Sequence, residues 1–142
     1  MIYKELRKRE EAGKPIRVGA SAIEWMGSGF VTAMAHVPGM ELSLLANADL
    51  DEAMQAYLST GLPREMIAEA DTPEAAEKLI QSGKRVITPD VTLAARVPAL
   101  DIVTDSTWSP AIGAEVANAC IEHGKDVVLV NIEADVTVGH IL

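Results

Sequence analysis

The segment IRVGASAIEWMGSGF, residues 16–30, changes its pattern halfway along. Its first part, IRVGAS, is a short run typical of a strand, and a helical segment follows from about Gly27 to His36. A strand that passes into a helix through so short a turn is followed by a parallel strand, and the crossover between the two is right-handed. The segment therefore predicts the start of a βαβ unit.

The same alternation continues along the chain. Further runs typical of strands are ELSLLA, EMIAEA as a minor strand, RVITPD, DIVTD and DVVLVN. Helices are expected at about residues 49–59, 72–83, 91–97 and 110–123, with Thr72 as a cap and Gly83 as a stop. This alternation predicts an α/β fold, a Rossmann-like open parallel sheet of about five or six strands with helices on both faces.

A charged segment precedes the first strand. Ile2 and Leu6 share one side of a short helix there, and Gly13 is its expected stop. We expect residues 1–14 to form a helical arm that docks on the remainder of the chain, and residues 15–142 to form the Rossmann-like domain.

Composition excludes several classes of partner. The chain has 142 residues, 49% of them hydrophobic, which suits a single domain with its own core. Its 21 acidic and 12 basic residues give a net charge of −9, which disfavours nucleic acid and anionic membranes as partners. The start of the chain lacks the apolar core of a signal peptide, and no apolar run is long enough to span a bilayer. A cytoplasmic location is expected.

The helix expected at residues 110–123 belongs to the most regular unit of the chain. Pro110 falls in its first turn and Gly124 follows its end. Ile112, Val116 and Cys120 recur four residues apart and predict one buried face. We therefore expect the single Cys120 to be a core residue rather than a nucleophile, and it can form no internal disulfide.

Ligands of such sheets bind beyond the carboxyl ends of the strands, where the strand order reverses. The segments expected at that edge are residues 21–25, 47–49, 106–109 and 131–135, with Gly139 and His140 close behind. Both tryptophans and several acidic residues fall on these segments, namely Trp25, Trp108, Glu24, Glu133 and Asp135.

The turn after the first strand is where a dinucleotide-binding fold places its glycine fingerprint. The Gly-x-Gly-x-x-Gly spacing falls on Ala22, Glu24 and Gly27, so only the helix-packing glycine is present. A carboxylate at Glu24, about 5 Å from a doubly charged pyrophosphate, would oppose binding by roughly 2 kcal/mol even in open water. Asn47 stands where an acidic residue would hold the adenosine ribose, and it can still hydrogen-bond a hydroxyl.

Several motifs resemble a known family. AGKPIRVG…MGSGFV…AHVPGMEL, IVTDST…GAEVANACIEHGKDVVLVN and EADVTVG resemble the amino-terminal domain of SAF-domain oxidoreductases, the homoserine-dehydrogenase-like group that includes deoxyxylulose-phosphate-reductoisomerase-like enzymes. The resemblance covers nearly the whole chain. It implies a Rossmann fold, NAD(P) as cofactor, and a following catalytic region that this chain lacks. Residues at the implied cofactor positions are Ala22, Gly27, Asn47 and Thr107.

The departures from that family lie together at the crevice. The family's first turn resembles GLIGAGxMG, where this chain has ASAIEW at residues 20–25. The turn after the fourth main strand resembles DATGTPE, where this chain has DSTWSPA with Trp108 in place of glycine. The ending VTVGP is replaced by VTVGH, with His140 at the last position. Because the changes gather at one site, they predict a remodelled dinucleotide site and weakened or lost NAD(P) binding.

The candidate residues leave alternatives open. Trp25 and Trp108 either plug the groove or stack on a planar ligand. Glu24 is either a solvated carboxylate at a helix start or a general base. His140 is either a base oriented by nearby acidic residues or a histidine of a fraying end. Ser106 is a candidate hydrogen-bond donor.

Three functions follow from these alternatives. The first is a Rossmann-type domain of an oxidoreductase-like protein with a blocked dinucleotide site. The second is a repurposed or engineered crevice that performs general-base chemistry on a planar aromatic small molecule, with Glu24 or His140 as the base. The third is a non-catalytic interaction module. A homodimer is a further possibility that the sequence leaves open.

The sequence does not support a metal site. No Cys/His spacing is typical of one, and Glu133 with Asp135 offers too few ligands.

Overall fold

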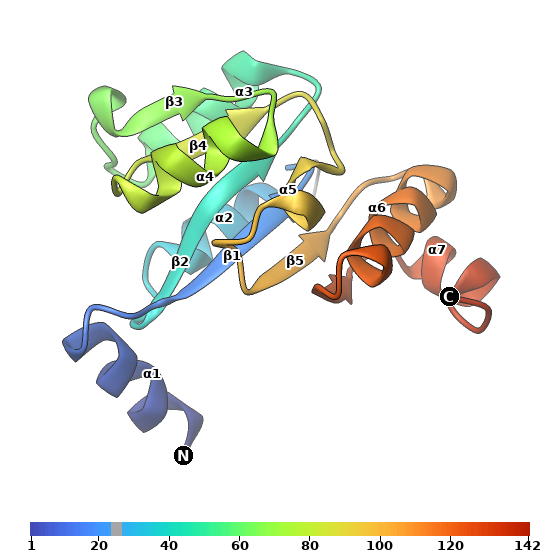
Figure 1. Cartoon of the computed structure of the whole chain (residues 1–142), viewed down its shortest axis with the longest axis horizontal. Helices are drawn as coiled ribbons and strands as arrows, with labels where there is room; N and C mark the ends of the chain where they lie inside the picture. Colours follow the sequence, from blue (N-terminus) through green and yellow to red (C-terminus); the bar gives the residue numbers. More distant parts are fainter. Residues whose placement is uncertain (24–26) are drawn as a thin grey trace.

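The computed structural model describes residues 1–23 and 27–142 (Figure 1). Six strands form one sheet in the order β3-β4-β2-β1-β5-β6, and all neighbouring strands are parallel. The strands are β1 (Ile16–Ser21), β2 (Met40–Ala46), β3 (Ile67–Glu69), β4 (Arg85–Thr88), β5 (Ile102–Asp105) and β6 (Asp126–Leu129). The predicted open parallel sheet is confirmed, including the minor strand β3.

Helices connect the strands. They are α1 (Ile2–Glu11), α2 (Gly27–Met34), α3 (Leu50–Ser59), α4 (Pro73–Gln81), α5 (Leu93–Arg96), α6 (Pro110–Glu122) and α7 (Ile132–Val138), with a 3₁₀ turn η1 (Arg64–Met66). Asp49, Thr72 and Ser109 each accept a hydrogen bond from the backbone N–H three residues further on, which fixes where α3, α4 and α6 begin. The sequence did not predict α7.

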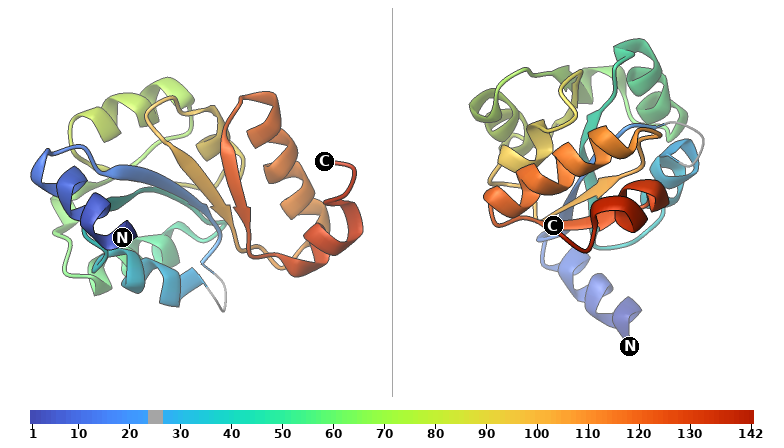
Figure 2. Two further views of the ribbon diagram at one scale, coloured as in Figure 1. Left: turned by 90° about the horizontal axis from the view of Figure 1, so that it is seen from below. Right: turned by 90° about the vertical axis from the view of Figure 1, so that its right-hand side faces the viewer.

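Helices cover both faces of the sheet, as predicted. One apolar core lies between the sheet and α4, α5 and α6, and a second lies between the opposite face and α2 and α3 (Figure 2, left). The central strand β2 is buried on both sides, with Leu44, Leu45 and Ala46 fully inaccessible. Val116 and Cys120 of α6 are also fully buried, and Ile112 is partly buried against the same core, which confirms the predicted core face of this helix.

Helix α1 projects away from the sheet (Figure 2, right). None of its residues is buried, and Gly39 packs against the backbone of Leu6. A Cβ at position 39 would lie 1.9 Å from the Leu6 carbonyl oxygen. The arm therefore touches the domain at Leu6, while its apolar residues Ile2 and Tyr3 are exposed.

None of the helices in residues 1–23 and 27–142 combines the length and the apolar character needed to cross a bilayer.

Candidate functional site

The carboxyl ends of the central strands meet at one edge of the sheet. The strand order reverses between β1 and β5, because the chain goes from β1 to β2 on one side and returns to β5 on the other. In parallel sheets, the crevice beyond this reversal is where ligands bind. The candidate site is therefore the edge beyond Ser21, Ala46 and Asp105.

Ala22 forms the turn after β1. Its φ angle is 67°, and it is the one non-glycine residue with a positive φ in the described parts of the chain. Its side chain is 5% exposed, and its N–H donates to the carbonyl oxygen of Ala46 at 2.7 Å. A left-handed conformation costs a residue with a Cβ roughly 1–2 kcal/mol. The turn thus has a backbone conformation that favours glycine, while it carries a methyl group.

Ser106 ties the loop after β5 to the turn after β1. Its hydroxyl lies 3.0 Å from the Ala22 carbonyl oxygen and 3.3 Å from that of Ser21, and its N–H donates to Ser21 at 3.0 Å. The Ser21 hydroxyl in turn donates to the Val91 carbonyl oxygen at 2.7 Å, in the loop after β4. Three loops are therefore bound to one another where a crevice would open. The Ser106 hydroxyl group donates its proton to backbone carbonyl oxygens of the protein itself.

Asn47 is also occupied by internal partners. Its side chain is buried, and its Nδ2 donates to the Asp49 carbonyl oxygen at 2.8 Å and to Glu52 Oε2 at 3.0 Å. Glu52 is an exposed residue in the first turn of α3, and it was not among the residues predicted from the sequence. Its place in that first turn was the available signal, since a side chain there can reach back to the end of β2.

A buried polar cluster lies beyond β5 and β6. Thr107 is 7% exposed, and its hydroxyl accepts a hydrogen bond from Asn131 Nδ2 at 3.2 Å. Asp105 is fully buried and accepts from the Thr107 N–H at 3.2 Å, while its Oδ2 has no hydrogen-bond partner among the described residues. Burial raises the pKa of the Asp105 carboxyl above its usual range, although hydrogen bonds from Thr107 oppose the shift. The sequence did not mark this carboxyl group as a candidate.

Gly113 of α6 makes room for that cluster. A Cβ at position 113 would lie 2.7 Å from Asn131 Nδ2 and 2.8 Å from Asp105 Oδ2. Helix α6 therefore packs closely over both polar side chains and keeps them from water.

Among the described residues, the other candidates are not gathered around one cavity. Trp108 is 64% exposed in the loop before α6. His140 is exposed in the turn after α7, and Glu133 and Asp135 are exposed on that helix. Gly27 is the first residue of α2. Glu24 and Trp25 lie outside the described residues.

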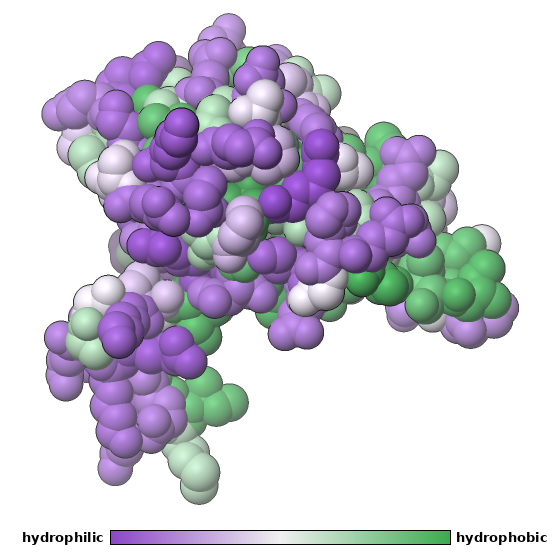
Figure 3. All heavy atoms as spheres, in the orientation of Figure 1, coloured by the Kyte–Doolittle hydropathy of each residue, from purple (hydrophilic) through white to green (hydrophobic). Residues whose placement is uncertain are grey.

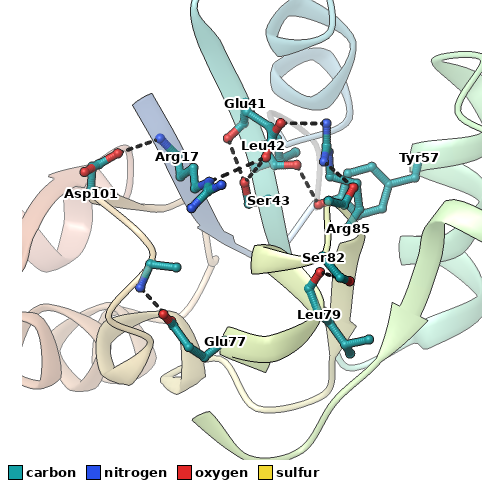
Figure 4. A network of polar contacts seen from close by, with 12 residues as sticks. Arg17, Glu41, Leu42, Ser43, Tyr57, Glu77, Leu79, Ser82, Arg85 and Asp101 are labelled. Carbon is teal, nitrogen blue, oxygen red and sulfur yellow. Dashed lines mark hydrogen bonds and ion pairs between the residues drawn. The ribbon is translucent and has the colours of Figure 1, made fainter. Parts of the chain in front are cut away.

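A separate cavity of about 440 Å³ lies at the opposite edge of the sheet, beside the amino ends of β2 and β4. Its wall contains Arg85, which pairs with Glu41 at 3.0 Å, and the buried Tyr57, whose hydroxyl donates to the Leu42 carbonyl oxygen at 3.2 Å (Figure 4). Burial raises the pKa of Tyr57 far above its usual range. This cavity is within the size range of small-molecule sites, but it is remote from the predicted crevice.

In the described part of the chain, no group of three or more His, Cys, Asp or Glu side chains is placed to hold a metal ion. Comparison with models of known protein families gives no match, and a search of curated proteins also gives none. The structure itself establishes a Rossmann-like α/β fold with a parallel sheet.

Proposed function

We propose that this chain is a Rossmann-type domain of an oxidoreductase-like protein whose dinucleotide site has been remodelled so that NAD(P) binds weakly or not at all. The observation that carries the proposal is the hydrogen-bonded closure between Ser106 and the turn at Ala22. In a dinucleotide site, the backbone at this turn must let the pyrophosphate approach, and glycine serves that approach.

Two further features support the proposal. The buried methyl group of Ala22 occupies space that a glycine would leave open. The Asn47 amide hydrogens bond to Asp49 and Glu52, so they are engaged before a ribose hydroxyl arrives. A nucleotide would have to replace these internal hydrogen bonds, and each replacement lowers the net gain on binding.

The test is a titration of NADH and of NADPH into the parent protein and into a variant carrying Ala22→Gly, Glu24→Gly and Trp108→Gly. Calorimetry and nicotinamide fluorescence report binding in both proteins. We expect no saturable binding by the parent at micromolar concentrations and measurable binding by the variant. Ser106→Ala, added to the triple variant, is expected to strengthen binding further because it releases the loops.

Two results would contradict the proposal. Micromolar binding by the parent would identify an ordinary cofactor domain. Absence of binding by both proteins, with both folded by circular dichroism, would mean that the crevice is not a blocked dinucleotide site.

A second candidate function is supported by the exposed indole of Trp108 beside the crevice. An indole in this place can stack on a planar aromatic molecule. Saturable binding of members of a planar heteroaromatic fragment set, measured by calorimetry, retained in Trp108→Phe and lost in Trp108→Ala, would favour this function over the first.

A further inference from the structure

Strand β6 forms an open edge of the sheet. It pairs with β5 on one side only. The Val130 N–H donates to the Asp105 carbonyl oxygen at 2.8 Å, so the backbone groups of Val130 face β5. Because these groups alternate sides along a strand, the N–H and C=O groups of Val127 and Leu129 face the open edge. No other described residue forms a backbone hydrogen bond with them.

An apolar surface adjoins this edge. Val128 is 46% exposed on β6, and Ile132 and Val136 are 69% and 74% exposed on α7. Figure 3 shows hydrophobic residues gathered at the end of the molecule formed by α7 and the carboxyl terminus. Val130, Ile141 and Leu142 are further exposed apolar residues of this part of the chain. Exposed apolar side chains that gather on one surface, rather than lying singly, are typical of interaction sites.

We propose that this surface, the β6 edge with the exposed side of α7, is a dimer interface for a second copy of the chain. The two β6 strands pair antiparallel about a two-fold axis at Val128. In this register, Val127 of one copy lies opposite Leu129 of the other, and the edge-facing N–H and C=O groups of both residues are satisfied reciprocally. The same surface serves both partners, as a two-fold interface requires.

Charge is compatible with this register. The exposed acidic residue Asp126 lies across from Val130 of the second copy rather than from its own counterpart. Two molecules that each carry a net charge of −9 nevertheless repel each other at long range. Because salt screens this repulsion, the dimer is expected to become tighter as ionic strength rises.

The decisive experiment changes Val128, the residue that lies on the proposed two-fold axis. Val128→Lys and Val128→Glu each place two like charges against each other in a dimer, so each variant alone is expected to be monomeric by sedimentation velocity. An equal mixture of the two variants is expected to dimerise again, because lysine then faces glutamate. The parent is expected to dimerise over a series from nanomolar to hundred-micromolar concentration.

Ile2→Lys is the matched control, since Ile2 is also an exposed aliphatic residue but lies on α1. This variant is expected to dimerise like the parent. The proposal is overturned if the parent stays monomeric throughout the series, or if both Val128 variants still dimerise. It is also overturned if the mixture of folded variants stays monomeric, because Val128 would then not lie on the axis. Circular dichroism of each variant checks that it is folded.

Discussion

Ala22 has a φ of 67°, which is an unfavourable backbone conformation for a residue with a Cβ. Its methyl group is buried, and burial of an apolar group is favourable. We expect Ala22→Gly to leave the free energy of unfolding unchanged or to raise it by up to about 1 kcal/mol, since relief of the left-handed strain outweighs the lost methyl contacts. The matched control is Ala20→Gly, in β1 and equally buried, which is expected to lower stability by about 1 kcal/mol. Urea denaturation measures both, and equal losses in the two variants would contradict a strained turn.

Asp105 is a second residue in an unfavourable environment, because its ionisable carboxyl group is fully buried. Burial raises the pKa of its carboxyl in the folded protein, so the folded state holds the proton more tightly than the unfolded state. The contribution of Asp105 to stability is therefore fully present below the ordinary carboxyl pKa and is lost as pH rises through the raised value. We expect Asp105→Asn to gain in stability relative to the parent as pH rises through this window.

Denaturant unfolding of the parent and of Asp105→Asn over a pH series measures that difference. Asp71→Asn, at an exposed position, is the control and is expected to follow the parent. A constant difference between Asp105→Asn and the parent at all pH values would mean that the folded protein does not alter the proton affinity of Asp105.

At the scale of elements, the packing of α5 on β1 depends on Gly19. A Cβ at this position would lie 2.7 Å from the Cβ of Ala94 and 2.9 Å from Leu100 Cδ1. Gly19→Ala is therefore expected to lower the free energy of unfolding by about 1–3 kcal/mol, because α5 must move away from the sheet. Gly29→Ala in α2 is the control, since a Cβ there meets no atom within 4 Å and helix propensity favours alanine by up to about 1 kcal/mol. Chemical denaturation should give the two variants opposite signs.

Most elements could be predicted from sequence because their signals are local. The cap at Thr72 and the stop at Gly83 bound α4 as expected, and Gly83 has a φ of 88°. Helix α7 was missed because residues 131–135 were interpreted only as a strand end. Its signal was Asn131, whose side chain accepts a hydrogen bond from the Ala134 N–H at 3.0 Å.

The candidate site was less predictable than the fold. The strand ends could be located, since periodicity marks where a strand stops, and Ala22 and Asn47 do lie there. The hydrogen-bond partners of these residues include groups on loops that are distant in sequence, as in the hydrogen bond from Ser106 to Ala22. Trp108 is exposed and Asp105 has an oxygen without a hydrogen-bond partner among the described residues. Both features depend on long-range packing, so no local sequence pattern predicts them.

At the scale of the whole molecule, the division into residues 1–14 and 15–142 stays a prediction that the contacts of α1 allow to be tested. The helix buries no residue, and the backbone of its Leu6 packs against Gly39 of the domain. We expect a protein lacking residues 1–13 to unfold cooperatively and to lose less than about 1 kcal/mol of stability, because exposed segments contribute little to the core. Deletion of residues 1–21 is the control: it removes β1, which pairs with both β2 and β5, and should abolish the cooperative transition. If the shorter deletion costs several kcal/mol, the arm is part of the domain, and the cavity between Glu10, Tyr57 and Leu62 is then a structural joint between them.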